Sequence, residues 1–451
     1  MLQTSLFPTL ASAKRSRKER IGVHAWHPYY AGYSEAFVSS AIAYLKLDST
    51  SASSACSCPE GLGTRKTPPS PLLLDPWNGS GTTALVASRW GIATLGWEIN
   101  PVMNVFSYAK SGYLFGQKHL LAELCQKITC KSLDASIPTS DPLGDFMSAS
   151  LCCGIRKLYA IVHSQEYPEP HFERAILKMI VKDKIQLNPF QAFFKAALFI
   201  TARNLAGYKG GSNPTWVKTQ SEKPEVGKTD MISEFKRVVG SMIRDLDLSS
   251  IPITDRILHL PVLADSRNLC LPDNAIDAVI TSPPYLTRID YAMSTRPELL
   301  IMFDPKTLRT IRENTIGAPV ILDKYIKINS TWGKTCLQLL ENVQKHGSKA
   351  ATSYYLPNMI QYFRDIELSL REIIRVLKHN ARAIIVVQSS YFKEHEIKLG
   401  DIYVEMGNNL GVKSEIVNRE IIRGHMAHVN TKSNQYKKGK IYFEDMVLLT
   451  K

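Results

Sequence analysis

Residues 281–285, Thr-Ser-Pro-Pro-Tyr, combine side chains and backbone groups that can handle an amino group. They follow the short apolar run 278–280, which is typical of a buried strand. The two prolines stiffen the backbone and withhold two N–H donors, so the strand ends in a rigid loop with polar groups at its mouth. Ligands of α/β proteins bind at such strand ends.

The chemistry that suits this loop is methylation of an exocyclic amino group on a nucleobase. That nitrogen is a poor nucleophile because its lone pair is delocalised, so an enzyme must accept hydrogen bonds from its N–H groups. Ser282 Oγ and the carbonyl of Pro283, followed by Pro284, can supply two acceptors, and Tyr285 offers a flat face for an extruded base. Taken alone, these four residues favour a plain Pro-Pro turn that closes a core strand.

A second segment, 72–83, runs from an apolar strand pattern through a glycine-rich turn into the helical pattern 84–90. The turn contains Asp75, Gly79, Ser80, Gly81 and Thr82. Glycines let the backbone approach a ligand closely, and a helix start directs N–H groups at its anionic end. The next strand, 95–100, carries Glu98 about 20 residues after the glycines, where such folds hold the hydroxyl pair of a ribose.

Together these segments resemble a known family. Residues 75–83 resemble the S-adenosylmethionine loop of the DNA amino-methyltransferases, and residues 281–285 resemble their catalytic loop. The resemblance covers roughly the first hundred residues and most of the stretch 255–451. Trp77 and Asn78 depart from it, because a Phe-Cys pair is more common there.

Two further segments carry the same resemblance. Residues 27–38, which include Tyr33, are similar to the segment that this family places near the methionine end of the cofactor. Residues 264–269 resemble its third-strand segment, in which an acid or its neighbour lies near the adenine. Asp265 and Ser266 are the candidates for that position.

The resemblance implies S-adenosyl-L-methionine as cofactor and double-stranded DNA as substrate. A serine, rather than Asp or Asn, before Pro-Pro-Tyr favours the N4 of cytosine, with the N6 of adenine as the alternative. An RNA base methyltransferase is a further alternative. The resemblance also implies a restriction–modification or related defence system, with a restriction endonuclease as a further partner.

Composition divides the chain into four parts. Residues 1–23 form a basic N-terminal arm, which either contacts phosphates or is a solvated terminus. Residues 24–101 form the cofactor-binding half of the methyltransferase core, and residues 256–451 form the catalytic half. Between them, residues 102–255 have helical patterns over 120–131, 143–163, 172–181, 189–205 and 232–246. This helical insertion either recognises the DNA target or is a cap that stabilises the sheet.

Three residues are candidates for DNA contact. Trp216 and Lys218 lie in a segment rich in Gly and Lys, in which an exposed Trp can stack on a base and lysines meet phosphate. A surface loop with its Trp folded inward is the competing interpretation. Arg288, near Tyr291, follows the catalytic loop and is expected to border the base pocket. Residues 304–352 read as irregular and partly basic, a second candidate surface for DNA.

Strand patterns near positions 73, 95, 258, 279, 385, 417 and 447 alternate with helices. They predict an α/β fold, a doubly wound, seven-stranded Rossmann-like methyltransferase sheet with a helical insertion. The helix 359–377 is expected to end at His379 and Asn380, where Asn takes a left-handed cap. Strands over 415–422 and 442–450 should form an antiparallel pair at the sheet edge.

Composition limits the class of protein. The 451 residues include 55 Lys and Arg against 41 Asp and Glu, a formal net charge of +14, which favours a polyanionic partner. The chain has no apolar run long enough to span a membrane and no apolar signal core, which predicts a cytosolic protein without a membrane partner. Eight cysteines without paired Cys-x-x-Cys spacing predict reduced thiols and no metal site.

Overall fold

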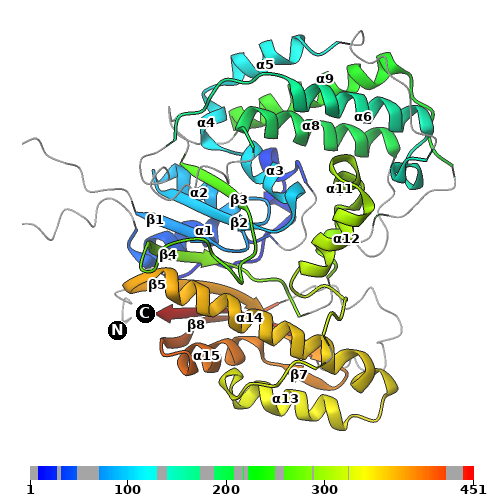
Figure 1. The fold of residues 1–451 in the computed structure, drawn as a ribbon. Coiled ribbons are helices and arrows are strands. Elements are labelled where there is room, and N and C mark those ends of the chain that lie inside the picture. Colours follow the sequence, from blue (N-terminus) through cyan, green and yellow to red (C-terminus); the bar gives the residue numbers. More distant parts are fainter. Residues whose placement is uncertain are drawn as a thin grey trace, which may run out of the picture.

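The structure is a computed structural model, which describes most of the chain. The described residues are 9–27, 32–47, 71–129, 140–172, 187–207, 217, 222–248, 258–286, 289–323, 325–422 and 440–451. Figure 1 shows a central sheet with a group of helices above it and a second group of helices below it. No helix among the described residues is long and apolar enough to cross a membrane.

The sheet has seven strands in the order β3-β2-β1-β4-β5-β9-β8, which confirms the predicted fold class. The strands are β1 (Leu72–Asp75), β2 (Ala93–Glu98), β3 (His259–Leu263), β4 (Ile276–Thr281), β5 (Leu377–Gln388), β8 (Lys413–Ile421) and β9 (Phe443–Thr450). Neighbours from β3 to β5 are parallel. The last strand, β9, lies between β5 and β8 and is antiparallel to both, so the predicted antiparallel pair exists and β8 forms the edge.

Helices cover both faces of the sheet because its central strands are apolar on both sides. On one face, Leu73 of β1 packs with α1 (Glu35–Leu45) and α2 (Thr82–Arg89). On the other face, Leu72 and Leu74 share a core with three helices. These are α13 (Lys334–Lys345), α14 (Leu356–Val376) and α15 (Leu399–Asn409). The result is a doubly wound three-layer arrangement.

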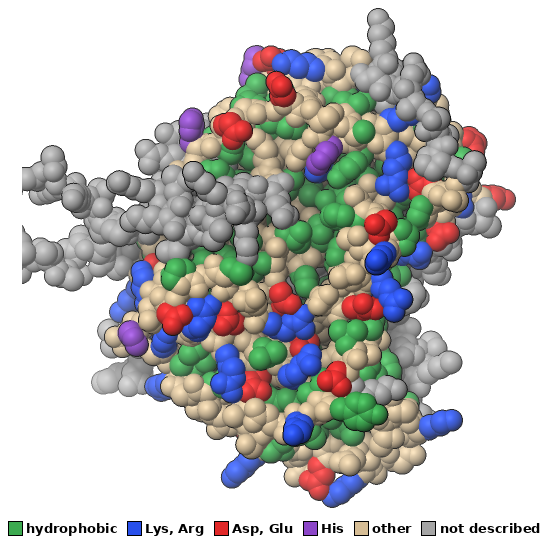
Figure 2. Space-filling view, viewed as in Figure 1, with side chains coloured by type: hydrophobic (Ala, Val, Ile, Leu, Met, Phe, Trp, Pro, Cys, Tyr) green, Lys and Arg blue, Asp and Glu red, His purple; other side chains and the backbone are tan. Residues whose placement is uncertain are grey.

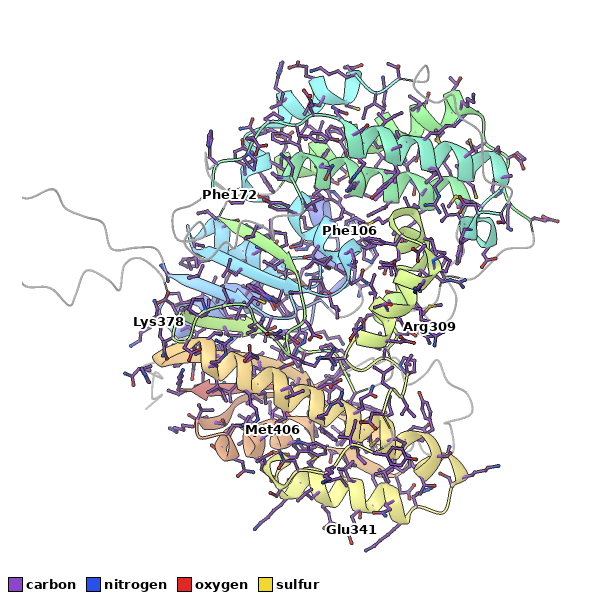
Figure 3. All side chains as sticks on the ribbon, viewed as in Figure 1. Phe106, Phe172, Arg309, Glu341, Lys378 and Met406 are labelled. Atoms are coloured by element: carbon purple, nitrogen blue, oxygen red, sulfur yellow. The ribbon has the colours of Figure 1, made fainter. Side chains whose placement is uncertain are left out.

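Most of the segment 102–255 forms a helical block with a core of its own. Its helices are α3 (Pro101–Ala109), α4 (Gly112–Phe115), α5 (Lys118–Gln126), α6 (Ala149–Ser164), α8 (Pro189–Ala206) and α9 (Lys228–Leu248). Phe106 of α3 lies where the block meets the sheet (Figure 3), with its ring 6.0 Å from that of Phe199 and 4.8 Å from that of His27. The helix predicted over 172–181 falls almost entirely outside the described residues.

The prediction that residues 304–352 are irregular is wrong. The helix α12 (Pro305–Asn314) begins after Asp304, whose side chain accepts a hydrogen bond from Thr307 N, and α13 follows in the same stretch. Two short helices, α10 (Tyr291–Ser294) and α11 (Arg296–Met302), precede α12. An Asp before Pro is a strong helix-start signal that the basic composition concealed.

The end of α14 also differs from the prediction. The helix ends at Val376 and β5 begins directly at Leu377. Asn380 does have a left-handed φ of 63°. However, it lies in β5, where its backbone N–H donates to Lys451 O at 2.8 Å. The sequence also gave no sign of the hairpin of β6 (Ser390–Phe392) and β7 (His395–Ile397).

The described part of the basic N-terminal arm, 9–23, packs against the core. Ala13 is 1% exposed, and its carbonyl accepts a hydrogen bond from Ser34 N. The arm therefore packs against the core at Ala13, whereas Lys14, Lys18 and Arg20 are exposed. The five described cysteines, Cys125, Cys152, Cys153, Cys270 and Cys336, form no disulfide.

Candidate functional site

The glycine-rich turn and the Ser-Pro-Pro loop start from neighbouring strands. β1 and β4 are adjacent and parallel, and the strand order reverses between them, because β2 and β3 continue on one side and β5 on the other. Their last residues touch, since Thr281 Oγ1 donates to Asp75 Oδ1 at 2.6 Å. Such a switch point is where open α/β sheets bind ligands.

Both loops line one pocket at this edge of the sheet, with an empty volume of about 920 Å³. Ten of the residues predicted for the site line it: Tyr33, Gly79, Ser80, Thr82, Glu98, Asp265, Ser266, Ser282, Pro283 and Pro284. Sequence reasoning had assigned no site role to Trp77, Asn78, Asn100, Met103, Ser294, Asn314, Thr315 and Ile316, which line it as well.

The glycine turn is held in a shape that only glycine adopts easily. Gly79 and Gly81 have φ of 49° and 81°, in the left-handed region. At Gly81 a Cβ atom would lie 2.4 Å from Ser107 Oγ and 3.0 Å from Ser107 Cα, so α3 closes the space behind the turn. Gly81 therefore supports the turn without lining the pocket, and α2 begins at once with Thr82.

Asp75 lies beneath the pocket and not in its lining. The carboxylate is 1% exposed and accepts hydrogen bonds from Trp77 N, Thr281 Oγ1, Thr83 Oγ1 and the hydroxyl of Tyr33. Burial raises its pKa, and the four donors work against that rise. Asp75 thus connects the glycine turn, the catalytic loop and the N-terminal segment.

Two cations support the same turn from behind. Arg15 donates to the carbonyl of Tyr33 at 2.8 Å and to Thr82 Oγ1 at 2.7 Å. Lys110 is 3% exposed and donates to the carbonyl of Ser80 at 3.1 Å. Burial lowers the pKa of Lys110 to about 7. The basic arm therefore contributes a structural arginine.

Glu98 stands at the end of β2, as the sequence predicts, and accepts hydrogen bonds from Gly79 N at 2.9 Å and Asn100 N at 2.8 Å. Burial raises its pKa to about 7, and these two N–H groups oppose the rise. Asn100 in turn caps α3 through its side chain, and its amide donates to Thr295 Oγ1 at 2.9 Å.

Asp265 and Ser266 line the pocket beyond β3. Both oxygens of Asp265 bond with Arg267, which also pairs with Asp365 of α14 at 3.0 Å. Ser266 Oγ lies 3.0 Å from Ser369 Oγ. These contacts fix the third-strand segment against α14.

The Ser-Pro-Pro loop presents Ser282, Pro283 and Pro284 to the pocket. The carbonyl of Pro284 already accepts a hydrogen bond from the hydroxyl of Tyr362 at 2.9 Å. Tyr285 is 9% exposed and its side chain is outside the lining, whereas Tyr291 lines the pocket, and its hydroxyl accepts from Tyr285 N at 3.2 Å. A base could meet the ring of Tyr291 directly, but that of Tyr285 only after a movement.

The residues predicted for DNA contact lie outside the described residues: Trp216, Lys218 and Arg288. Tyr291, three positions after Arg288, lines this pocket. Asn100 could have been found from the sequence, because an Asn before a Pro is a common start of a helix. Asn78 has no such sequence signal.

Comparison with known proteins found no matching family model. It found two similar curated proteins. The chain is 22% identical over 368 residues to the type II methyltransferase M.MvaI of Kocuria varians, a match that covers 74% of this chain and 73% of that protein. It is 25% identical over 267 residues to the type II methyltransferase M.BsoBI of Geobacillus stearothermophilus, over 55% of this chain and 50% of that protein.

Proposed function

We propose that this protein is a DNA methyltransferase that transfers a methyl group from S-adenosyl-L-methionine to an exocyclic amino nitrogen, with cytosine N4 as the first choice. One observation carries the proposal: the glycine turn and the Ser-Pro-Pro loop line a single pocket at the switch point of the sheet. The similarity to two type II methyltransferases supports the same class of reaction.

The lining residues fit the cofactor. Gly79 and the start of α2 suit its methionine part, because the backbone leaves room there and the helix N–H groups favour a carboxylate. Asn78 Oδ1 is buried without a hydrogen-bond donor among the described residues, which suits an ammonium group. Glu98 suits the ribose hydroxyls, and Asp265 and Ser266 suit the adenine side. The cofactor supplies an electrophilic methyl group when bound.

The catalytic loop handles the target nitrogen. Ser282 Oγ and the carbonyl of Pro283 accept hydrogen bonds from its N–H groups and direct its lone pair at the methyl carbon. With the cofactor bound, its methyl group would pass from sulfur to this nitrogen as the S–C bond breaks, and the nitrogen would then release its proton to water. Ser282 need not act as a base, because the methylated nitrogen is strongly acidic before it loses that proton.

The substrate is proposed as duplex DNA with the target base extruded into the pocket. The net charge of +14 suits a polyanion, and the helical block is the proposed target-recognition module. A restriction endonuclease is the proposed functional partner. Cytosine N4 is preferred because serine precedes the Pro-Pro pair, and adenine N6 is the second candidate.

The test is incubation of the purified protein with methyl-labelled cofactor and, separately, unmethylated plasmid DNA or RNA. Label in duplex DNA supports the proposal, and label only in RNA contradicts it. Mass spectrometry of the nucleosides released from DNA then decides the base, since N4-methyl-2′-deoxycytidine and N6-methyl-2′-deoxyadenosine differ in mass. Absence of label in both nucleic acids, with intact cofactor binding, would reject the proposed substrate.

A further inference from the structure

The connection between α12 and α13 exposes large hydrophobic side chains. Leu322 is 52% exposed, Tyr325 is 92% exposed and Ile328 is 47% exposed. Single exposed apolar residues are ordinary, but three within seven positions of one loop are not. We define these three residues as the apolar tip.

The loop is fixed at its base by α14, which it crosses in Figure 1. Asn358 Nδ2 donates to Ala318 O at 3.2 Å, and Gln361 Nε2 donates to Val320 O at 2.9 Å. Gln361 Oε1 also accepts from Leu322 N at 2.9 Å. Asn358 and Gln361 are buried, with 5% and 7% exposed. Buried side chains thus satisfy the loop backbone, while the apolar tip stays in solvent.

The far end of the loop is held in the same way. Asn329 Nδ2 donates to Glu367 of α14 at 3.1 Å, and Thr331 Oγ1 donates to the same carboxylate at 3.0 Å. Trp332, which is fully buried, donates to it at 2.7 Å. The loop is therefore attached to α14 at both ends, so that its exposed residues are carried by a fixed frame.

The loop leaves directly from the rim of the pocket. Residues 314–316 line the pocket, and the next residue, Gly317, turns the chain with a φ of 77°. A Cβ atom on Gly317 would lie 3.2 Å from the carbonyl of Tyr285 in the catalytic loop. The loop therefore starts at the pocket rim, and the apolar tip begins five residues after Gly317.

Exposed cations lie on the loop and on the helix before it. Lys306 and Arg309 on α12 and Lys327 on the loop are exposed, and Arg309 is labelled on the outer part of α12 in Figure 3. Arg309 pairs with Glu313, and Asp323 caps the loop at Tyr325 N, so acidic groups are present as well. Figure 2 shows hydrophobic side chains among charged ones over this lower part of the molecule.

We propose that the apolar tip, led by Tyr325, is a wedge that enters duplex DNA beside the target and fills the gap left by the extruded base. This inference rests on the proposed function. An aromatic ring stacks on any base, and apolar wedges between base steps are a known means of unstacking a duplex. Neighbouring cations are suited to hold the phosphates on either side.

The test compares paired and unpaired targets. The methylated position is first mapped with the unaltered protein on plasmid DNA from a host without DNA methyltransferases. Two short duplexes follow, one with the target base paired and one with it opposite an abasic site, where extrusion is already favourable. We expect Tyr325→Ala to lower kcat/KM on the paired duplex by roughly 5- to 100-fold, the value of one base–aromatic stack. Its activity on the unpaired duplex should be close to that of the unaltered protein.

Two variants serve as controls. Tyr325→Trp keeps a ring and should retain activity on the paired duplex. Trp90→Ala removes an aromatic residue that is 41% exposed at the end of α2, outside the pocket lining. Its kcat/KM on both duplexes should equal that of the unaltered protein. Because Tyr325 packs on little, thermal unfolding of Tyr325→Ala should match that of the unaltered protein.

Each other outcome is decisive. Equal activity of Tyr325→Ala and the unaltered protein on paired duplex overturns the wedge, and so does an equal loss on both duplexes, which would mean general DNA binding. A change from dimer to monomer in Tyr325→Ala would assign the apolar tip to a second copy of the chain. If the unaltered protein methylates no DNA at all, the proposed function fails, and the wedge falls with it.

Discussion

The two sides of the pocket are built differently. On the side of the glycine turn, several polar groups already have protein partners: four donors surround Asp75, Glu98 accepts from Gly79 N, and Arg15 donates to Thr82. Asn78 Oδ1 has no donor among the described residues. On the side of the catalytic loop, Ser282 and the Pro283 carbonyl face the pocket, while the ring of Tyr285 is buried outside it.

This difference suggests which groups hold each side of the pocket in place. The backbone of the turn is held by protein contacts before any ligand binds, which suits a small cofactor of fixed shape. The loop side has Tyr362 behind it at Pro284 and, on our proposal, the apolar tip beside it. We therefore expect substitutions on the turn side to act on cofactor binding, and those on the loop side to act on transfer.

The largest effect is expected from Gly81→Asp. The new side chain would need a left-handed backbone and would collide with Ser107 of α3. We expect complete loss of cofactor binding in calorimetry. Gly91→Asp is the matched control, because Gly91 also has a positive φ, of 67°, yet has nothing within 4 Å of its Cβ position. If Gly81→Asp and Gly91→Asp bound the cofactor with equal affinity, the close packing of this turn would be contradicted.

Ser282→Ala should come next. If its hydroxyl accepts a hydrogen bond that strengthens as the nitrogen becomes tetrahedral, removing it should lower kcat by about 10²–10³-fold, as for other single groups that act in the transition state. The dissociation constant of the cofactor should not change. Ser294→Ala is the control: that hydroxyl also lines the pocket but donates to Tyr291 O at 2.7 Å. Retained transfer in Ser282→Ala would remove this hydroxyl from the mechanism.

The same contrast explains what the sequence could predict. Glycines, prolines and the acid at the end of β2 have local signatures, so the two loops and the seven strands could be predicted from spacing. Arg15 and Tyr362 could not, because each acts through a contact with a residue 67 or 78 positions away along the chain. α12 was missed for another reason, since its exposed, charged face concealed a helix that Asp304 and Pro305 begin.

The third prediction concerns pH and the turn side. On the proposed function, ribose hydroxyls donate hydrogen bonds to Glu98, which favours its ionised form. Cofactor binding should then lower its pKa from about 7 and release a proton below that pH. The dissociation constant should therefore rise about tenfold for each pH unit below 7, the limit for one ionising group.

Glu98→Gln supplies the baseline, because Lys110, with a pKa of about 7, titrates over the same range behind the turn. Glu98→Gln should bind the cofactor more weakly than the unaltered protein does at pH 8. Any pH dependence of binding that remains in this variant comes from other groups. An unchanged pH profile in Glu98→Gln would mean that Glu98 does not carry the effect.

The smallest effect, Tyr362→Phe, separates support of the loop from general stability. Its hydroxyl is the donor to Pro284 O and lies 3.4 Å from the hydroxyl of Tyr403, which is also buried. Removing it leaves buried groups unpaired, so we expect a loss of about 1–3 kcal/mol in the free energy of unfolding. Because the loop loses its support at Pro284, kcat should fall about fivefold, which corresponds to about 1 kcal/mol in activation free energy.

Tyr403→Phe is the control. It disturbs the same pair of hydroxyls but keeps the bond to Pro284. It should therefore be destabilised with kcat intact, and an equal fall of kcat in both variants would show that only the stability of the core is involved.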